Sequence, residues 1–247
     1  MVDNTGLFSG KADDYSKFRP SYPDAAIDFL AARSRAESVL DVGAGTGIFT
    51  AKLAGTFKNV AALEPNAEMR REFLKFLPEI ACLDGTGEAT GMPDNSVDLI
   101  TVAQAFHWLD AEKFKAEAMR ILRPAGQVAI VWNNSIENEF TIERKRICQK
   151  YCPRFASGHA GKRSAAEGDG FLRHEYFTQV EVVAFDNPFV MDIEIFEGNM
   201  RSRSYALTPN DSGYGEFITE LRTAFYRFAQ NGTVIEPQET QIYFGKF

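Results

Sequence analysis

The 247-residue sequence contains no long hydrophobic run. No stretch of it approaches the roughly 20 apolar residues that a membrane-spanning helix needs. Its first residues, Met1-Val2-Asp3-Asn4-Thr5, also lack the basic segment and the following apolar segment of a secretory signal. We therefore expect a cytoplasmic protein that has no membrane partner.

Cysteine is scarce in this sequence, and an excess of positive charge is absent. The three cysteines, Cys82, Cys148 and Cys152, are an odd number and form no Cys/His cluster with the spacing of a structural zinc site. We therefore predict no bound metal. The net charge of −7 argues against the broad basic face that a nucleic acid requires, so we expect no nucleic-acid partner.

The length and composition are those of an ordinary globular protein. Apolar residues make up 45% of the chain and charged residues 25%. A chain of this length suits one large α/β domain, and we expect a single domain over residues 1–247.

The most informative segment is Val39-Leu40-Asp41-Val42-Gly43-Ala44-Gly45-Thr46-Gly47-Ile48-Phe49. Its apolar start predicts a buried strand, and the residues after Gly47 predict a helix. Glycines let the backbone turn sharply and let a ligand lie against it at a helix N-terminus. Glu64 ends the next apolar run, where its carboxylate would accept hydrogen bonds from a ribose. This context favours a nucleoside-cofactor site over an ordinary glycine-rich turn.

The glycine spacing distinguishes between cofactors. A dinucleotide fingerprint is Gly-x-Gly-x-x-Gly, whereas this chain has Gly43, Gly45 and Gly47 after Asp41. The segment resembles the first motif of the class I S-adenosylmethionine-dependent methyltransferases. The resemblance implies S-adenosylmethionine as cofactor and S-adenosylhomocysteine as product, with Asp41 offsetting the ammonium group of the cofactor. The residues assigned to the cofactor in this part of the chain are Asp41, Gly43, Ala44, Gly45, Gly47, Glu64, Pro65 and Met69.

Strand and helix patterns alternate along the first half of the chain, which predicts right-handed crossovers and a parallel sheet. The expected strands are 39–42, 60–63, 80–83, 97–103, 128–132, 180–185 and 242–247. The expected helices are 24–33, 67–76, 112–122, 137–151, 216–230 and one that begins at 48. We predict a doubly wound, Rossmann-like, mostly parallel seven-stranded sheet with an antiparallel last strand, as the resemblance implies.

The loop after the third expected strand contains Thr86, Gly87 and Glu88. In the family this loop frames the adenine, often with an acidic side chain on its exocyclic amine. Many relatives carry Asp where this chain has Thr86, so Glu88 or the backbone around Gly87 is the alternative contact. A polar turn without a binding role is also open.

The fourth expected strand ends at Ala103 and leads into Gln104-Ala105-Phe106-His107-Trp108. This stretch resembles the Ala-Gln-Ala-Phe-His-Trp of a methyltransferase type 11 subgroup that includes trans-aconitate methyltransferase-like enzymes. We assign Ala103 and Gln104 to the cofactor, and His107 and Trp108 to the catalytic region beside the transferred methyl. His107 is a general base, a substrate-positioning residue or a structural residue, since methyl transfer does not always need a base.

The N-terminal segment Tyr15-Ser16-Lys17-Phe18-Arg19-Pro20-Ser21-Tyr22-Pro23 is similar to a Tyr-x-x-Phe-Arg-Pro-x-Tyr-Pro stretch of the same subgroup. The resemblance implies that Tyr15 and Arg19 help to cover the cofactor. The alternative is that the aromatic residues only pack an N-terminal arm onto the domain.

Basic residues accumulate after the fifth expected strand. Between Glu143 and Arg173 there are eight Lys/Arg and three acidic residues. This run is either a solvated helix face or a basic cap that receives an anionic acceptor. We expect cap elements from residues 1–23, 135–178 and 190–215, and we assign Arg201 and Arg203 to an acceptor carboxylate.

These features together predict methyl transfer to a small-molecule acceptor, which carries a carboxylate if the basic run forms a cap over the site. Two other functions remain open. The chain is a non-catalytic cofactor-binding module, or it is a nicotinamide-dependent dehydrogenase, which the glycine spacing disfavours. The sequence gives neither the acceptor nor the oligomeric state.

Overall fold

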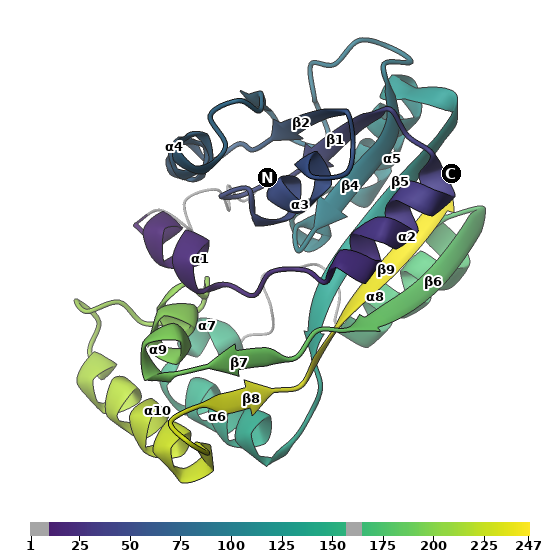
Figure 1. Cartoon of the computed structure of the whole chain (residues 1–247). Helices are drawn as coiled ribbons and strands as arrows, with labels where there is room; N and C mark the ends of the chain where they lie inside the picture. Colours follow the sequence, from purple (N-terminus) through teal and green to yellow (C-terminus); the bar gives the residue numbers. More distant parts are fainter. Residues whose placement is uncertain (1–9, 157–164) are drawn as a thin grey trace.

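The computed structural model describes residues 10–156 and 165–247, and their centre is a seven-stranded sheet (Figure 1). The strand order is β3-β2-β1-β4-β5-β9-β6, and β9 runs antiparallel to both of its neighbours. The strands are β1 (Ser38–Val42), β2 (Asn59–Leu63), β3 (Cys82–Leu83), β4 (Val97–Ala103), β5 (Leu122–Ser135), β6 (Gln179–Asp186) and β9 (Gln238–Lys246). The predicted mostly parallel sheet with an antiparallel last strand is confirmed.

Helices cover both faces of this sheet. On one face, apolar side chains such as Leu30, Phe49 and Leu53 pack against the strands. On the other face, Phe114 and Tyr176 belong to a second cluster. The helices of the first face are α2 (Asp24–Ser34), α3 (Ile48–Ala54) and α4 (Ala67–Phe76), and those of the second are α5 (Ala111–Ile121) and α8 (Ala165–Phe171). This arrangement is the doubly wound architecture, with ligands expected at the carboxyl ends of the strands.

Two features of the sheet differ from the sequence expectation. β5 is longer than expected, because Arg123–Gly126 do not end a helix but continue the strand, whose Leu122 pairs with Val97. A second, two-stranded sheet joins β7 (Phe189–Met191) to β8 (Val234–Glu236). Three-residue strands far apart in the sequence have no local pattern that would reveal their pairing.

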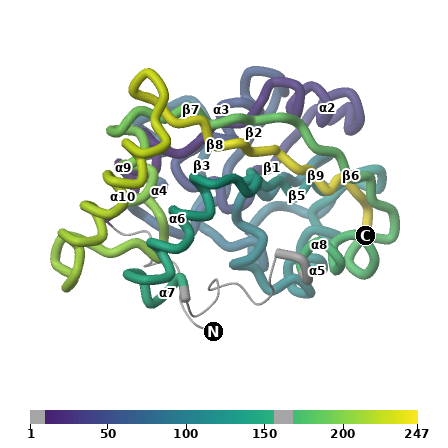
Figure 2. The backbone as a smooth tube through the Cα atoms, turned by 90° about the horizontal axis from the view of Figure 1, so that it is seen from below, coloured from purple at the N-terminus to yellow at the C-terminus, as the bar shows by residue number. Residues whose placement is uncertain are grey.

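A separate layer of helices forms the cap. Its apolar cluster includes Phe140, Phe196 and Phe225. The cap contains α6 (Glu139–Tyr151), α7 (Pro153–Ala156), α9 (Ile193–Arg201), α10 (Tyr214–Phe228) and the β7–β8 sheet, and α1 (Ala12–Phe18) lies against α9 (Figures 1 and 2). Phe171, Leu172 and Tyr176 of the expected cap segment 135–178 instead pack on the α5 face of the sheet. Helix α10 and strand β8 belong to the cap although they lie outside the expected segments.

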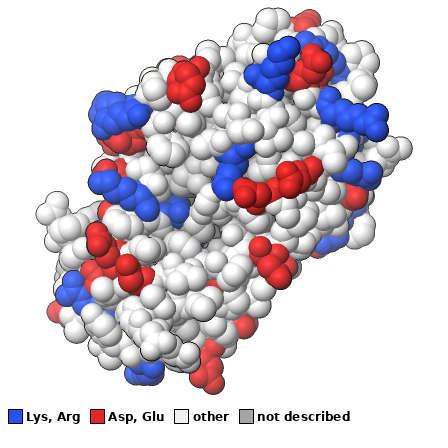
Figure 3. Space-filling model, in the orientation of Figure 1, with Lys and Arg blue, Asp and Glu red and all other residues white. Residues whose placement is uncertain are grey.

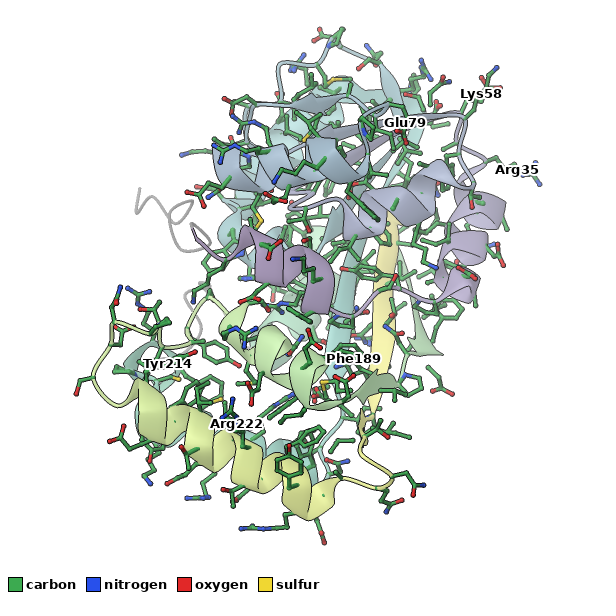
Figure 4. All side chains as sticks on the ribbon, turned by 60° about the vertical axis from the view of Figure 1, so that its left-hand side comes forward. Arg35, Lys58, Glu79, Phe189, Tyr214 and Arg222 are labelled. Carbon is green, nitrogen blue, oxygen red and sulfur yellow. The ribbon has the colours of Figure 1, made fainter. Side chains whose placement is uncertain are left out.

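The cap lies at the carboxyl ends of the strands. Figure 4 shows Arg35, Lys58 and Glu79, which precede β1, β2 and β3, at the end of the molecule opposite Tyr214 and Arg222 of α10. No helix in the described ranges 10–156 and 165–247 is long and apolar enough to span a bilayer.

Candidate active site

The glycine turn lies between β1 and α3 and has the backbone conformation that glycine favours. Gly43, Gly45 and Gly47 have φ angles of +69°, +59° and +91°. A Cβ on Gly43 would lie 2.6 Å from the Cβ of Ala105, so the turn and the end of β4 come into direct contact. Side chains other than hydrogen are therefore excluded at Gly43 by sterics as well as by backbone conformation.

Glu64 connects the glycine turn to the start of α4. Its carboxylate accepts hydrogen bonds from the backbone N–H of Gly45 (2.9 Å) and of Asn66 (2.8 Å). Asn66 in turn caps α4, because its side chain accepts from the N–H groups of Glu68 and Met69. Burial raises the pKa of Glu64, and the two backbone bonds oppose this effect. The side chain of Glu64, which is predicted to bind the ribose, is thus held beside the glycine turn at the carboxyl end of β2.

Asp41, which is predicted to offset the ammonium group of the cofactor, lies at the end of β1 beneath the glycine turn. It is buried, and its two carboxylate oxygens accept from the hydroxyls of Thr50 (2.6 Å) and Thr101 (2.7 Å). Burial raises the pKa of Asp41 to about 6. The carboxylate therefore ties β1 to α3 and β4 beneath the glycine turn.

The segment after β3 is held against the segment after β4. Gly87 is buried, and a Cβ there would lie 3.1 Å from Leu109 and from Val42. Glu88 accepts a hydrogen bond from the N–H of Asp110 (2.8 Å), and Thr86 is exposed. One carboxylate oxygen of Glu88 therefore fixes the start of α5.

Two further residues that were assigned to the cofactor follow β2. Met69 is buried and Pro65 is partly exposed.

The end of β4 carries a strained residue and an aromatic cluster. Gln104, which follows Ala103, has a φ of +56°, an unusual value for a residue with a side chain, and its amide donates to the carbonyl of Asn133 (3.2 Å). The centroid of the His107 ring lies 4.4 Å from the ring centroid of Trp108 and 5.2 Å from that of Trp132. Trp132, on β5, was not assigned from the sequence, although its place at the end of a buried strand was a usable signal.

The N-terminal arm covers the glycine turn. A Cβ on Gly45 would lie 3.8 Å from the ring of Tyr15, and the guanidinium of Arg19 lies 4.8 Å above the same ring. Arg19 donates to the Ser202 hydroxyl (2.8 Å) and carbonyl (3.2 Å). Burial lowers the pKa of Arg19 to about 10, and the charge of Arg203 contributes to this shift. Arm, turn and cap therefore meet at Tyr15 and Arg19.

The two arginines that were assigned to the acceptor differ in their surroundings. Arg201 forms a two-point ion pair with Asp14 of α1, with N–O distances of 2.9 and 3.2 Å. Arg203 donates one bond to Asn199 (3.1 Å), and its buried Nε has no hydrogen-bond partner among the described residues. In residues 10–156 and 165–247, neither Arg19 nor Arg203 forms an ion pair with a carboxylate.

The basic run after β5 is largely neutralised. The residues of this run in ion pairs with Asp or Glu are Arg144, Lys145, Arg146, Lys150 and Arg173. Lys162 and Arg163 lie outside the described residues. Figure 3 shows positive and negative side chains interspersed on one face of the molecule.

Within the described part of the chain, no group of three or more His, Cys, Asp or Glu side chains is placed to hold a metal ion.

Comparison with known proteins agrees with this geometry. A model of the methyltransferase domain family matches residues 40–130. An uncharacterised methyltransferase of Mycobacterium bovis is 42% identical over 130 residues, which cover 53% of each chain, so the match spans about half the length of that relative. An uncharacterised methyltransferase-like protein of Schizosaccharomyces pombe is 32% identical over 184 residues, 70% of this chain and 72% of the relative.

A solved structure extends the likeness to the cap. A proposed type II methyltransferase of Anaeromyxobacter dehalogenans superposes with a TM-score of 0.65 at 25% identity, over 93% of this chain and 98% of the other. The glycine turn and the buried Glu64 lie within residues 40–130, the part that the family model matches. The chain belongs to the methyltransferase-domain family of class I S-adenosylmethionine-dependent methyltransferases.

Proposed function

We propose that this protein transfers a methyl group from S-adenosylmethionine to a small-molecule acceptor that carries a carboxylate. The observation that carries the cofactor assignment is the Glu64 carboxylate, bonded to the N–H groups of Gly45 and Asn66 at the carboxyl edge of the sheet. A ribose hydroxyl is a donor that this carboxylate accepts at the same edge. A Cβ on Gly45 would have only the ring of Tyr15 within 4 Å, at 3.8 Å, which fits a cofactor that lies against the turn there.

The chemistry needs little from side chains beyond alignment. The cofactor, held by Glu64 and the glycine turn, would supply a methyl group on a positive sulfonium. An acceptor oxygen, nitrogen or carbon would form a bond to the methyl carbon, in line with the C–S bond that breaks, and S-adenosylhomocysteine would leave. The protein contributes proximity and the exclusion of water. His107, between Trp108 and Trp132, borders this position and either positions the acceptor or takes its proton.

The proposal of an acceptor carboxylate rests on two partly buried cations, Arg19 and Arg203. The guanidinium groups of Arg19 and Arg203 are both desolvated, and the positive charge of Arg203 contributes to the lowered pKa of Arg19. The Glu236 carboxylate lies near Arg203 and raises the pKa of that arginine, whereas Arg19 forms no ion pair among the described residues. An arginine binds a further carboxylate with strong, directed hydrogen bonds. An anionic acceptor between arm and cap relieves this repulsion. A carboxylate acceptor would also be in keeping with the resemblance of the sequence to the trans-aconitate methyltransferase-like subgroup.

Replacing Glu64 by alanine tests the cofactor assignment. We expect S-adenosylhomocysteine to bind the variant more weakly by about 1–3 kcal/mol, because the ribose loses a charge-assisted partner and the glycine turn loses its tether. Isothermal calorimetry on the wild-type protein and the variant measures this change, with NAD as the comparison ligand. Unchanged affinity in the variant, or tighter binding of NAD than of S-adenosylhomocysteine by the wild type, contradicts the assignment.

Replacing Arg203 by glutamine tests the acceptor assignment, and Arg201→Gln is its matched control. A screen of carboxylic acids with methyl-labelled cofactor first identifies an acceptor. We then expect Arg203→Gln to raise the KM for that acid by about tenfold or more, the effect of a lost charged hydrogen bond, and Arg201→Gln to leave it nearly unchanged because Asp14 occupies Arg201. Equal effects of the two variants contradict the role of Arg203. Cofactor binding without turnover on any acceptor supports the non-catalytic alternative.

A further inference from the structure

A second group of buried polar side chains lies beside Arg203, at the junction of β5, β8, β9 and α6. Its centre is Glu236, which is 1% exposed and forms an ion pair with Arg144. Gln238, which is 5% exposed, donates from its Nε2 to the second oxygen of Glu236 (3.1 Å). The positive charges of Arg144 and Arg203 hold the pKa of Glu236 below its usual value against the effect of burial. Glu236 is therefore ionised, and each of its two carboxylate oxygens accepts a hydrogen bond.

Two polar atoms of this group lack a partner among the described residues. They are the amide oxygen Oε1 of Gln238 and the Nε of Arg203. The orientation of the Gln238 amide is set by its bond to Glu236, because the opposite orientation would place the amide oxygen against a carboxylate oxygen. One of the two atoms needs a donor and the other needs an acceptor. A buried polar atom without a partner is costly, and most such atoms in native proteins bind a water or a ligand.

Strand β5 connects this group to the end of β4, where the reacting end of the cofactor is expected. Gln104, at the end of β4, donates to the carbonyl of Asn133 on β5. Ser135 is two residues further along β5 and pairs directly with Gln238. At the rise of an extended strand, this step is about 7 Å. From the other side, Arg19 of the arm bonds to Ser202, the neighbour of Arg203.

We propose that the methyl acceptor carries a hydroxyl or amino group that donates a hydrogen bond to the amide oxygen of Gln238, in addition to the anionic group that binds Arg203. This inference rests on the proposed function. The acceptor is then a hydroxy or amino carboxylic acid and not a simple acid. A site built with buried hydrogen-bonding groups rejects an analogue that lacks the matching group, because its own polar atom then stays unpaired.

Binding of matched acids to the full-length protein tests this proposal. With S-adenosylhomocysteine at saturation, calorimetry compares three series: propionate, lactate and alanine; succinate, malate and aspartate; glutarate, 2-hydroxyglutarate and glutamate. In at least one series we expect a donor-bearing member to bind about fivefold or more tighter than the simple acid, the value of one hydrogen bond to a buried group. This wild-type comparison requires no variant.

Gln238→Met removes the amide at nearly the same volume. We expect the preference for the donor-bearing acid to fall to within about twofold in this variant, with unchanged affinity for S-adenosylhomocysteine. Gln230→Met, at an exposed site, is the matched control and is expected to retain the preference. Simple acids that bind as tightly as their hydroxy and amino counterparts, no binding of any acid, or a preference that survives Gln238→Met overturns the proposal. Failure to bind S-adenosylhomocysteine at all refutes instead the proposed function.

Discussion

Replacing Gly43 by alanine is expected to lower the free energy of unfolding by about 2–5 kcal/mol and to weaken the binding of S-adenosylhomocysteine by at least about tenfold. Two effects add up. A residue with a Cβ pays about 1–2 kcal/mol to adopt a φ of +69°. The added Cβ would also lie 2.6 Å from the Cβ of Ala105, and such a contact requires the end of β4 to move.

Gly91→Ala isolates the backbone contribution. Gly91 has a φ of +71°, close to that of Gly43, but a Cβ on it would meet nothing within 4 Å. We expect Gly91→Ala to cost only about 1–2 kcal/mol and to leave cofactor affinity unchanged. Urea unfolding and calorimetry on the two variants measure both quantities. If the two substitutions have the same effect, the contact between the glycine turn and Ala105 has no role in binding.

Replacing Arg144 by methionine is expected to destabilise the protein by about 3–5 kcal/mol. The side chains of Arg144 and Glu236 are only 12% and 1% exposed, so the variant leaves an ionised carboxylate in a poorly solvated site. Arg203, Ser135 and Gln238 remain near Glu236 and compensate part of this cost. The loss is measured by urea unfolding at neutral pH. A loss below about 1 kcal/mol would show that these neighbours suffice.

Two further variants show whether the loss of stability in Arg144→Met comes from the unpaired buried charge. Arg33→Met removes one partner of an ion pair with Glu181 whose side chains are 54% and 38% exposed, and we expect it to cost less than about 1 kcal/mol. The double variant Arg144→Met, Glu236→Leu removes both buried charges and is expected to recover much of the stability lost in Arg144→Met. A double variant that is less stable than the single one contradicts this electrostatic explanation.

Much of the sheet was predictable because its signals are local. Each strand of the parallel half contains a short apolar run, and helices α4 and α5 begin after the capping residues Asn66 and Asp110. The order of these elements fixes a doubly wound sheet, since parallel strands need crossover helices of one hand. The cofactor turn was predictable for the same reason, because Gly43, Gly45 and Gly47 are nearly adjacent in the chain.

The cap and the acceptor region were predictable only in part. The helical pattern of residues 216–230 indicated α10 but not that it packs with α6 and α9 around Phe196. Neither β7 nor β8 was expected, because three residues carry too little periodicity and their pairing joins distant parts of the chain. Trp132 was recognised as a strand residue but not as a neighbour of His107.

The sequence by itself determined the family, the parallel half of the sheet and the cofactor turn. Each of these depends on patterns of residues that are close together in the chain. Only the tertiary structure separated Arg203 from Arg201, which are two positions apart and equal in charge. Arg201 meets Asp14, whereas Arg203 lies near Glu236, and both contacts join segments far apart in the chain. Buried charge and unpaired polar atoms are set by such contacts, because desolvation depends on every segment that surrounds a group and not on its own neighbours in sequence.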